Sequence, residues 1–314
     1  MKVPLIGTQA KTISFVSSRL NINPAPGQVL IQDESVLTNG LTNDWWQGRL
    51  IGDDKMRQLK ILICAVALVA VVSGSSMAQG WGNLKIKFTY GGEYAAPAKI
   101  AVTRDAAVCG KFGLVDESLV VNPENKGIAN VIVFYRDRTP AKIHPSYNDA
   151  LEAPVLVDNI KCRFEPRVAA VWTKRKIDFK NSDPVGHNVK VDTFFNPVIN
   201  PILPAGAKIS QSYAMEERLP TKISCSIHPW MTGWIVVRND PYIGVSDKDG
   251  NLEIKNLPAG EFEFQIWQEK AGYIQQVTQE GKTVEWARGR VKIKIEDGKT
   301  TDFGSVVIGA DQFK

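Results

Sequence analysis

The stretch Cys225-Ser-Ile-His228-Pro-Trp-Met231 places three metal-binding side chains in one short segment. A thiolate, an imidazole and a thioether follow one another at three-residue steps. The chain of 314 residues holds only 3 histidines and 5 methionines. A given cysteine would carry His at plus three and Met at plus six by chance on the order of once in several thousand trials. The spacing therefore indicates a metal site.

The three donors of this segment suit copper. Soft sulfur ligands and imidazole serve both Cu(I) and Cu(II), in a trigonal set of two His and one Cys with a long axial Met contact. A structural zinc site usually needs a second Cys/His pair, and covalent haem needs Cys-x-x-Cys-His. The sequence contains neither pattern. We therefore predict one type 1 copper ion bound by Cys225, His228 and Met231.

A second imidazole must come from another part of the chain. His187 follows the strand breaker Asn-Ser-Asp-Pro at residues 181–184, between β-rich runs at 171–180 and 189–195. It therefore lies at a predicted strand end. His144 competes for this place, but its surroundings are Pro-rich and loop-like. We predict His187 as the fourth ligand.

The pattern Gly-His187-Asn188 followed by Cys225-x-x-His228-x-x-Met231 resembles the cupredoxin (type 1 blue-copper) family, of the amicyanin and plastocyanin type. The resemblance is specific over about residues 168–239. It implies an all-β fold with a Greek-key β-sandwich, in which two loops hold the copper. It also implies that the two imidazoles and the thiolate are equatorial ligands and that the thioether is axial.

The same resemblance implies roles for three neighbours of the ligands. Asn188 would tie the two ligand loops together by hydrogen bonds. His228 would be the ligand nearest the surface, with Pro229 and Trp230 forming an apolar docking patch around it. A redox protein such as a c-type cytochrome would dock there. Ser224 departs from the family pattern, because amicyanin-like loops have an aromatic residue at that position.

The expected ligand set leaves copper no open position for a substrate. We therefore expect a one-electron carrier without a small-molecule substrate, and not an enzyme. Copper oxidases and nitrite reductases need additional histidine-rich centres, whereas only His144 remains here. A copper chaperone, a copper store or a structural subunit of a periplasmic or cell-surface complex stays open as the alternative.

Residues 56–78 are typical of a secretory signal peptide. A basic start after Met56 precedes an apolar run at residues 61–72 and small residues at Ser76 and Ala78. The apolar run has 12 residues, whereas a membrane-spanning helix needs about 20. We expect a periplasmic or otherwise exported protein, associated with a membrane only if this segment is uncleaved. Residues 1–55 are then an untranslated or disordered extension.

We expect cleavage after Ala78, and two further cysteines, Cys109 and Cys162, follow that point. Export implies an oxidising compartment, in which thiols tend to pair or to bind metal. Cys109 and Cys162 have no histidine at ligand spacing. A mutual disulfide is the simpler interpretation, and a second metal site with His144 is the alternative.

The sequence changes character after residue 239. Residues 242–246, 252–254 and 261–267 form a series of strands separated by turns. This region resembles the transthyretin-like, carboxypeptidase-regulatory type of β module. We therefore predict a copper domain over residues 79–239 and a smaller β-sandwich over residues 240–314.

The charges of the chain argue against a nucleic-acid partner. The 38 basic and 33 acidic residues give a formal net charge of +5. They are scattered along the sequence and form no Lys/Arg stripe of the kind that nucleic-acid binding needs. We expect no nucleic acid among the partners.

Overall fold

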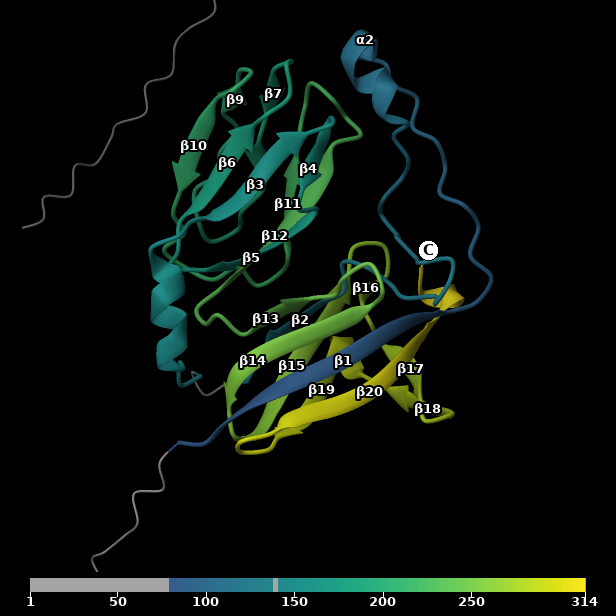
Figure 1. Cartoon of the computed structure of the whole chain (residues 1–314), viewed down its shortest axis with the longest axis vertical. Helices are drawn as coiled ribbons and strands as arrows, with labels where there is room; N and C mark the ends of the chain where they lie inside the picture. Colours follow the sequence, from purple (N-terminus) through teal and green to yellow (C-terminus); the bar gives the residue numbers. More distant parts are fainter. Residues whose placement is uncertain (1–78, 138–140, 314) are drawn as a thin grey trace, which may run out of the picture. The chain divides into compact units, whose positions relative to one another are not determined.

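A computed structural model describes residues 79–137 and 141–313, which fold mainly into β-strands (Figure 1). The all-β prediction is confirmed. The helices described are short: α2 (Ala106–Cys109), η1 (Gly110–Phe112), η2 (Pro145–Leu151), η3 (Ala287–Gly289) and η4 (Ala310–Gln312). In these residues no helix has the length and apolar character needed to cross a bilayer. The predicted signal peptide and residues 1–55 lie outside the described residues.

The central part of the chain forms two four-stranded sheets around one core. One sheet has the order β10-β6-β3-β4 and the other the order β5-β12-β11-β8, and a short pair, β7 with β9, stands beside them. We call strands β3 to β12 the inner unit. Their bounds are β3 (Val155–Ile160), β4 (Arg163–Glu165), β5 (Val168–Trp172), β6 (Ile177–Asn181), β7 (His187–Asn188), β8 (Lys190–Val191), β9 (Ile202–Leu203), β10 (Lys208–Gln211), β11 (Thr221–Ser224) and β12 (Thr232–Arg238).

The remaining strands form a second pair of sheets, which we call the outer unit. One sheet has the order β14-β1-β20-β17-β18, and the other has β13-β2-β15-β16 with β19 paired to β15. Their bounds are β1 (Trp81–Gly91), β2 (Ile132–Tyr135), β13 (Ile243–Val245), β14 (Asn251–Pro258), β15 (Gly260–Gln268), β16 (Gly272–Tyr273), β17 (Gln276–Gln279), β18 (Lys282–Glu285), β19 (Arg290–Ile295) and β20 (Thr300–Gly309).

The sheets do not follow the expected division at residue 239. Strand β1 pairs with β14 and β20, and β2 pairs with β13 and β15, so the N-terminal strands belong to the outer unit. Strand β1 alternates, burying Leu84, Ile86 and Phe88 in the core of that unit. Alternation identifies a strand and its buried face, but not its partners. The inner unit is thus inserted between β2 and β13.

Residues 98–116 leave the outer unit and pack on the inner one. Lys99 and Val115 form an antiparallel bridge between the two arms, and the Ile100 N–H donates to the Leu114 carbonyl at 2.9 Å. Helix α2 lies at the tip of this excursion, far from the outer sheets (Figure 1). Both Cys109 and Leu114 are buried in the core of the inner unit. Two sequence-distant segments, 98–116 and 155–238, therefore build one unit.

The inner and outer units share a small apolar contact and an ion pair. Ile132, Phe134 and Trp267 of the outer unit pack with Val168 and Val236 of the inner unit. A bidentate pair joins the same two units, in which Arg167 Nε and Nη2 bind the Glu269 carboxylate at 2.7 and 2.8 Å. Planar, two-point pairing of this kind fixes orientation as well as distance.

Candidate metal centre

The segment that carries the predicted ligands is a tight connection between two strands. Strands β11 and β12 are antiparallel, and Ser224 lies opposite Thr232. Inside the connection, the Cys225 N–H donates to the Met231 carbonyl at 3.2 Å and the Met231 N–H donates to the His228 carbonyl at 2.9 Å. These two bonds hold the three donor residues on a rigid frame, which a metal site needs.

His187 comes from a separate segment of the chain and meets this connection. It begins β7, which pairs with β9 through His187 and Leu203. Ligand atoms of His187, Cys225 and His228 all lie within 4.8 Å of one another, and all three residues are buried. The two Nδ1 atoms are 2.9 Å apart, and Cys225 Sγ is 3.7 Å from His228 Nδ1. One ion can therefore bind all three atoms.

Met231 completes the predicted set. Its side chain is buried and belongs to the same core cluster as Cys225. Two imidazoles, a thiolate and a thioether are the donors of a type 1 copper site. The structure thus brings His187, Cys225 and His228 together, and Met231 lies in the same connection and the same core cluster as Cys225.

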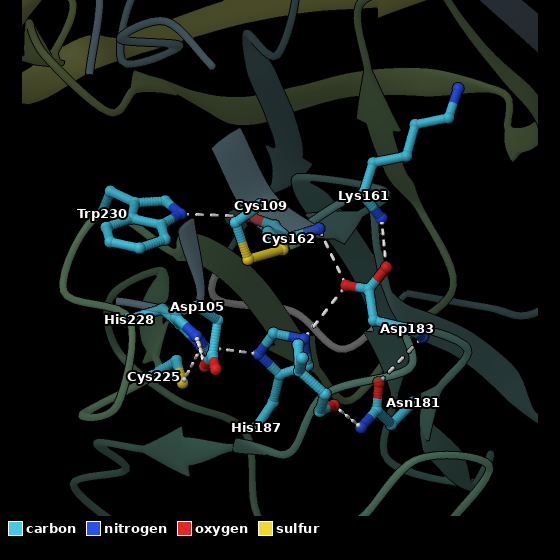
Figure 2. Close-up of a disulfide and its surroundings, with 11 residues drawn as sticks. Asp105, Cys109, Lys161, Cys162, Asn181, Asp183, His187, Cys225, His228 and Trp230 are labelled. Atoms are coloured by element: carbon cyan, nitrogen blue, oxygen red, sulfur yellow. Dashed lines mark hydrogen bonds and ion pairs between the residues drawn. A yellow bond between two sulfur atoms is a disulfide. The ribbon is translucent and has the colours of Figure 1, made fainter. Parts of the chain in front are cut away.

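A carboxylate contacts the Nε2 atom of each imidazole. His187 Nε2 lies 3.0 Å from Asp183 Oδ2, and His228 Nε2 lies 2.7 Å from Asp105 Oδ2 (Figure 2). An ionised carboxylate only accepts hydrogen bonds, so each Nε2 carries its proton. Carboxylates placed in this way orient the imidazoles of metal sites and fix their tautomers.

This arrangement turns the two Nδ1 lone pairs toward each other. Two neutral acceptors 2.9 Å apart repel unless a cation, either a proton or a metal ion, lies between them. Burial and the neighbouring His228 lower the pKa of His187, although Asp183 opposes this shift. A soft metal ion that also binds the Cys225 thiolate would satisfy both nitrogen lone pairs. The donor chemistry fits copper.

Asn188 links the two ligand segments. Its Oδ1 accepts the backbone N–H of Ser226 at 2.7 Å and that of Ile227 at 3.3 Å. The backbone N–H of Asn188 points at Cys225 Sγ over 3.5 Å. An N–H aimed at a thiolate stabilises the negative charge on sulfur. Asn188 thus occupies the position between the loops that the family resemblance implied for it.

The surroundings of His228 differ from those that the resemblance implied. The His228 side chain is fully buried, since Asp105 covers its Nε2. Trp230 lies beside it, with ring centroids 5.2 Å apart, and donates its indole N–H to the Cys162 carbonyl at 3.3 Å. Pro229 is exposed. The docking patch predicted from Pro229 and Trp230 is therefore limited on one side by residues 98–116, which a family pattern based on residues 168–239 does not include.

The structure contains the disulfide between Cys109 and Cys162, with an S–S distance of 1.99 Å. Cys225 is unpaired and buried. His144 lies in the outer unit, where its ring packs on Trp81 at 4.9 Å between centroids and its Nδ1 contacts Ser146. The alternative metal site of the two cysteines with His144 is not formed.

Two residues of the site were missed by the sequence analysis. Asp183 is buried, and its carboxylate also accepts the N–H groups of Lys161 and Cys162 at 2.7 and 2.8 Å. It lies in the strand breaker just before a predicted ligand, which was a usable signal. Asp105 gave no local signal, because it precedes His228 by 123 residues.

No protein-family model and no curated protein matches the chain. Among solved structures, part of it is similar to a copper-containing nitrite reductase from Thermus scotoductus, with 25% identity over 27% of this chain and 22% of that one, at a TM-score of 0.24. The chain thus spans about a fifth of that reductase.

Two smaller proteins are also similar. A reduced Cu(I) form of an amicyanin variant is 21% identical over 27% of this chain and 83% of that one, with a TM-score of 0.25. A purple cupredoxin from Nitrosopumilus maritimus is 23% identical over 27% of this chain and 99% of that one, with a TM-score of 0.23. Because these overlaps are partial and the scores low, the copper assignment depends on the donor geometry given above.

Proposed function

We propose that this protein is an exported type 1 copper protein that carries single electrons. The observation behind the proposal is the pair of Nδ1 atoms of His187 and His228, 2.9 Å apart and within reach of the buried Cys225 thiol. Copper would supply one-electron chemistry between Cu(I) and Cu(II), and sulfur with imidazole suits both states.

The residues around the ligands support a carrier because they keep the donors in place. Asp183 and Asp105 fix the imidazole rings, and Asn188 joins the two ligand segments. The four proposed ligands are almost fully buried, which limits access by water and by substrates. A site of this kind reorganises little when an electron arrives or leaves.

Export, partner and accessory unit remain proposals. The Cys109–Cys162 disulfide agrees with an oxidising compartment outside the cytoplasm. A redox protein such as a c-type cytochrome is the proposed partner. The likeness of residues 240–314 to a transthyretin-like, carboxypeptidase-regulatory module stays a prediction from the sequence.

Spectroscopy of copper-loaded protein tests the proposal. We expect a strong visible band that bleaches reversibly on reduction, and a Cu(II) spin-resonance signal with small copper hyperfine splitting. Cys225→Ser and His187→Gln should abolish the band, while the matched control His144→Gln should retain it. Tight Cu(I) binding without any visible band would instead favour the copper chaperone or store.

A further inference from the structure

We propose that Asp105 is a positioning residue of the copper site, which the disulfide-anchored excursion brings onto His228. The inference deepens the proposed function and rests on it. Asp105 Oδ2 lies 2.7 Å from His228 Nε2. The two residues are far apart in sequence, so the contact depends on the path of residues 98–116.

The local backbone presents the Asp105 side chain to the site. Its carbonyl accepts the N–H groups of Val108 and Cys109, each at 2.9 Å, which closes the turn of α2. Asp105 itself has φ 47° and ψ 39°, in the left-handed region. Asp tolerates this conformation better than most residues because its short polar side chain bonds locally. Here that side chain bonds a buried imidazole instead.

The disulfide connects the two carboxylates of the site. Cys109 ends the turn that Asp105 begins, and it is bonded to Cys162. The Cys162 N–H in turn donates to Asp183 Oδ2 at 2.8 Å, the same oxygen that contacts His187 (Figure 2). The Cys109–Cys162 disulfide therefore connects the turn that carries Asp105 to the residue that donates to Asp183.

The Asp105 carboxylate has two effects on a bound metal. A negative charge at Nε2–H makes the imidazole a stronger donor and favours the more positive oxidation state. It also restrains rotation of the ring. Loss of such an outer partner typically lowers metal affinity by roughly 10- to 100-fold.

Substitution of Asp105 tests this role. Asp105→Ala should weaken Cu(II) binding by roughly 10- to 100-fold and raise the reduction potential, since it removes both charge and acceptor. Asp105→Asn should fall between parent and Ala, because its amide oxygen can still accept the Nε2–H. The control Asp149→Asn removes one exposed charge from η2 and should match the parent. Parent-like affinity and potential in Asp105→Ala would overturn the role.

Zinc separates this inference from the proposed function. Zn(II) also binds imidazole and thiolate, so its affinity reports on His228 whether or not the parent gives a blue-copper spectrum. A colourless parent overturns the electron-carrier proposal, and the Zn(II) affinities still decide the role of Asp105. Unchanged Zn(II) and Cu(II) affinities in Asp105→Ala with a blue parent overturn only the inference.

A double-mutant cycle tests the part played by the disulfide. Cys109→Ser with Cys162→Ser frees the excursion, whereas Asp183 keeps its bond from the Lys161 N–H. If the disulfide acts through Asp105, its removal and Asp105→Ala should be non-additive in metal affinity. Additive losses would show that the disulfide does not deliver Asp105 to the site.

Discussion

Asn188 Oδ1 accepts the Ser226 N–H at 2.7 Å and so joins the segment of His187 to the segment of Cys225. Asn188→Ala leaves this N–H and that of Ile227 without their acceptor. Each unsatisfied donor costs about 1–3 kcal/mol, so we expect the free energy of unfolding to fall by about 2–6 kcal/mol for the two donors together. Denaturant titration of the metal-free protein measures this.

Asn200→Ala is the matched control for that substitution. Asn200 is exposed, and its side-chain oxygen accepts a hydrogen bond from the Asn188 side chain. Its removal should cost less than about 1 kcal/mol. Equal losses in the two variants would contradict the linking role of Asn188.

Replacement of the thioether separates the axial ligand from the other three. Met231→Leu keeps a buried apolar side chain of similar volume, so the fold and the copper–thiolate colour should persist. Loss of the weak axial donor should raise the reduction potential. Met215→Leu changes an exposed methionine and should leave the potential unaltered. Voltammetry of both variants decides, and loss of all colour in Met231→Leu would contradict an axial role.

Asp240 gives the stability of the fold a dependence on pH. Burial raises the pKa of this carboxyl to about 6, against the opposing effect of Arg238. A folded-state pKa above the unfolded value near 3.8 means that the folded protein binds the proton more tightly. The protonated Asp240 side chain therefore stabilises the fold fully below about pH 4. This contribution to the free energy of unfolding, up to about 3 kcal/mol, is lost as the pH rises through about 6.

Asp240→Asn should remove that dependence while its amide oxygen still accepts the Tyr242 N–H. The unfolding free energy of parent and variant, measured at pH 5 and 7, gives the comparison. Asp149→Asn serves as the control and should follow the parent. A variant that loses as much stability as the parent over this range would exclude Asp240 as the source.

The pair of Arg167 and Glu269 contributes to the joint between the two units. Its side chains are only 13% and 10% exposed. Glu269→Ala leaves the guanidinium poorly paired, with Glu117 at 3.7 Å as its remaining carboxylate. We expect a loss of about 3 kcal/mol in unfolding free energy.

Glu261→Ala breaks an exposed pair with Lys292 and should have no measurable effect. The double variant Arg167→Ala with Glu269→Ala should be less destabilised than the sum of the single variants. Strict additivity would mean that the two side chains do not interact energetically.

The ligands in one short segment were predictable from the sequence, whereas the pairing of distant strands was not. Cys225, His228 and Met231 lie within one segment, so their spacing alone indicated the chemistry. His187 was selected because a strand breaker precedes it. The partners of β1 and β2 lie more than a hundred residues away, and alternation does not encode them.

The contact of Asp105 is another that local sequence patterns do not encode. Its contact with His228 needs the fold of residues 98–116, the Cys109–Cys162 disulfide and a left-handed backbone at Asp105. None of these is visible from the residues adjacent to it. Asp183, by contrast, is four residues before His187, and a search for carboxylates near predicted ligands would have found it.

The inner unit receives chain from two separate passages, residues 98–116 and residues 155–238. A recombinant fragment cut at the ends of the second passage would keep all four donors but lose Asp105 and Cys109. Conversely, proteolytic cleavage anywhere within residues 110–161 of the folded protein would leave that passage covalently attached through sulfur. A shortened version of this protein therefore has to retain both passages, although they are separated in the sequence.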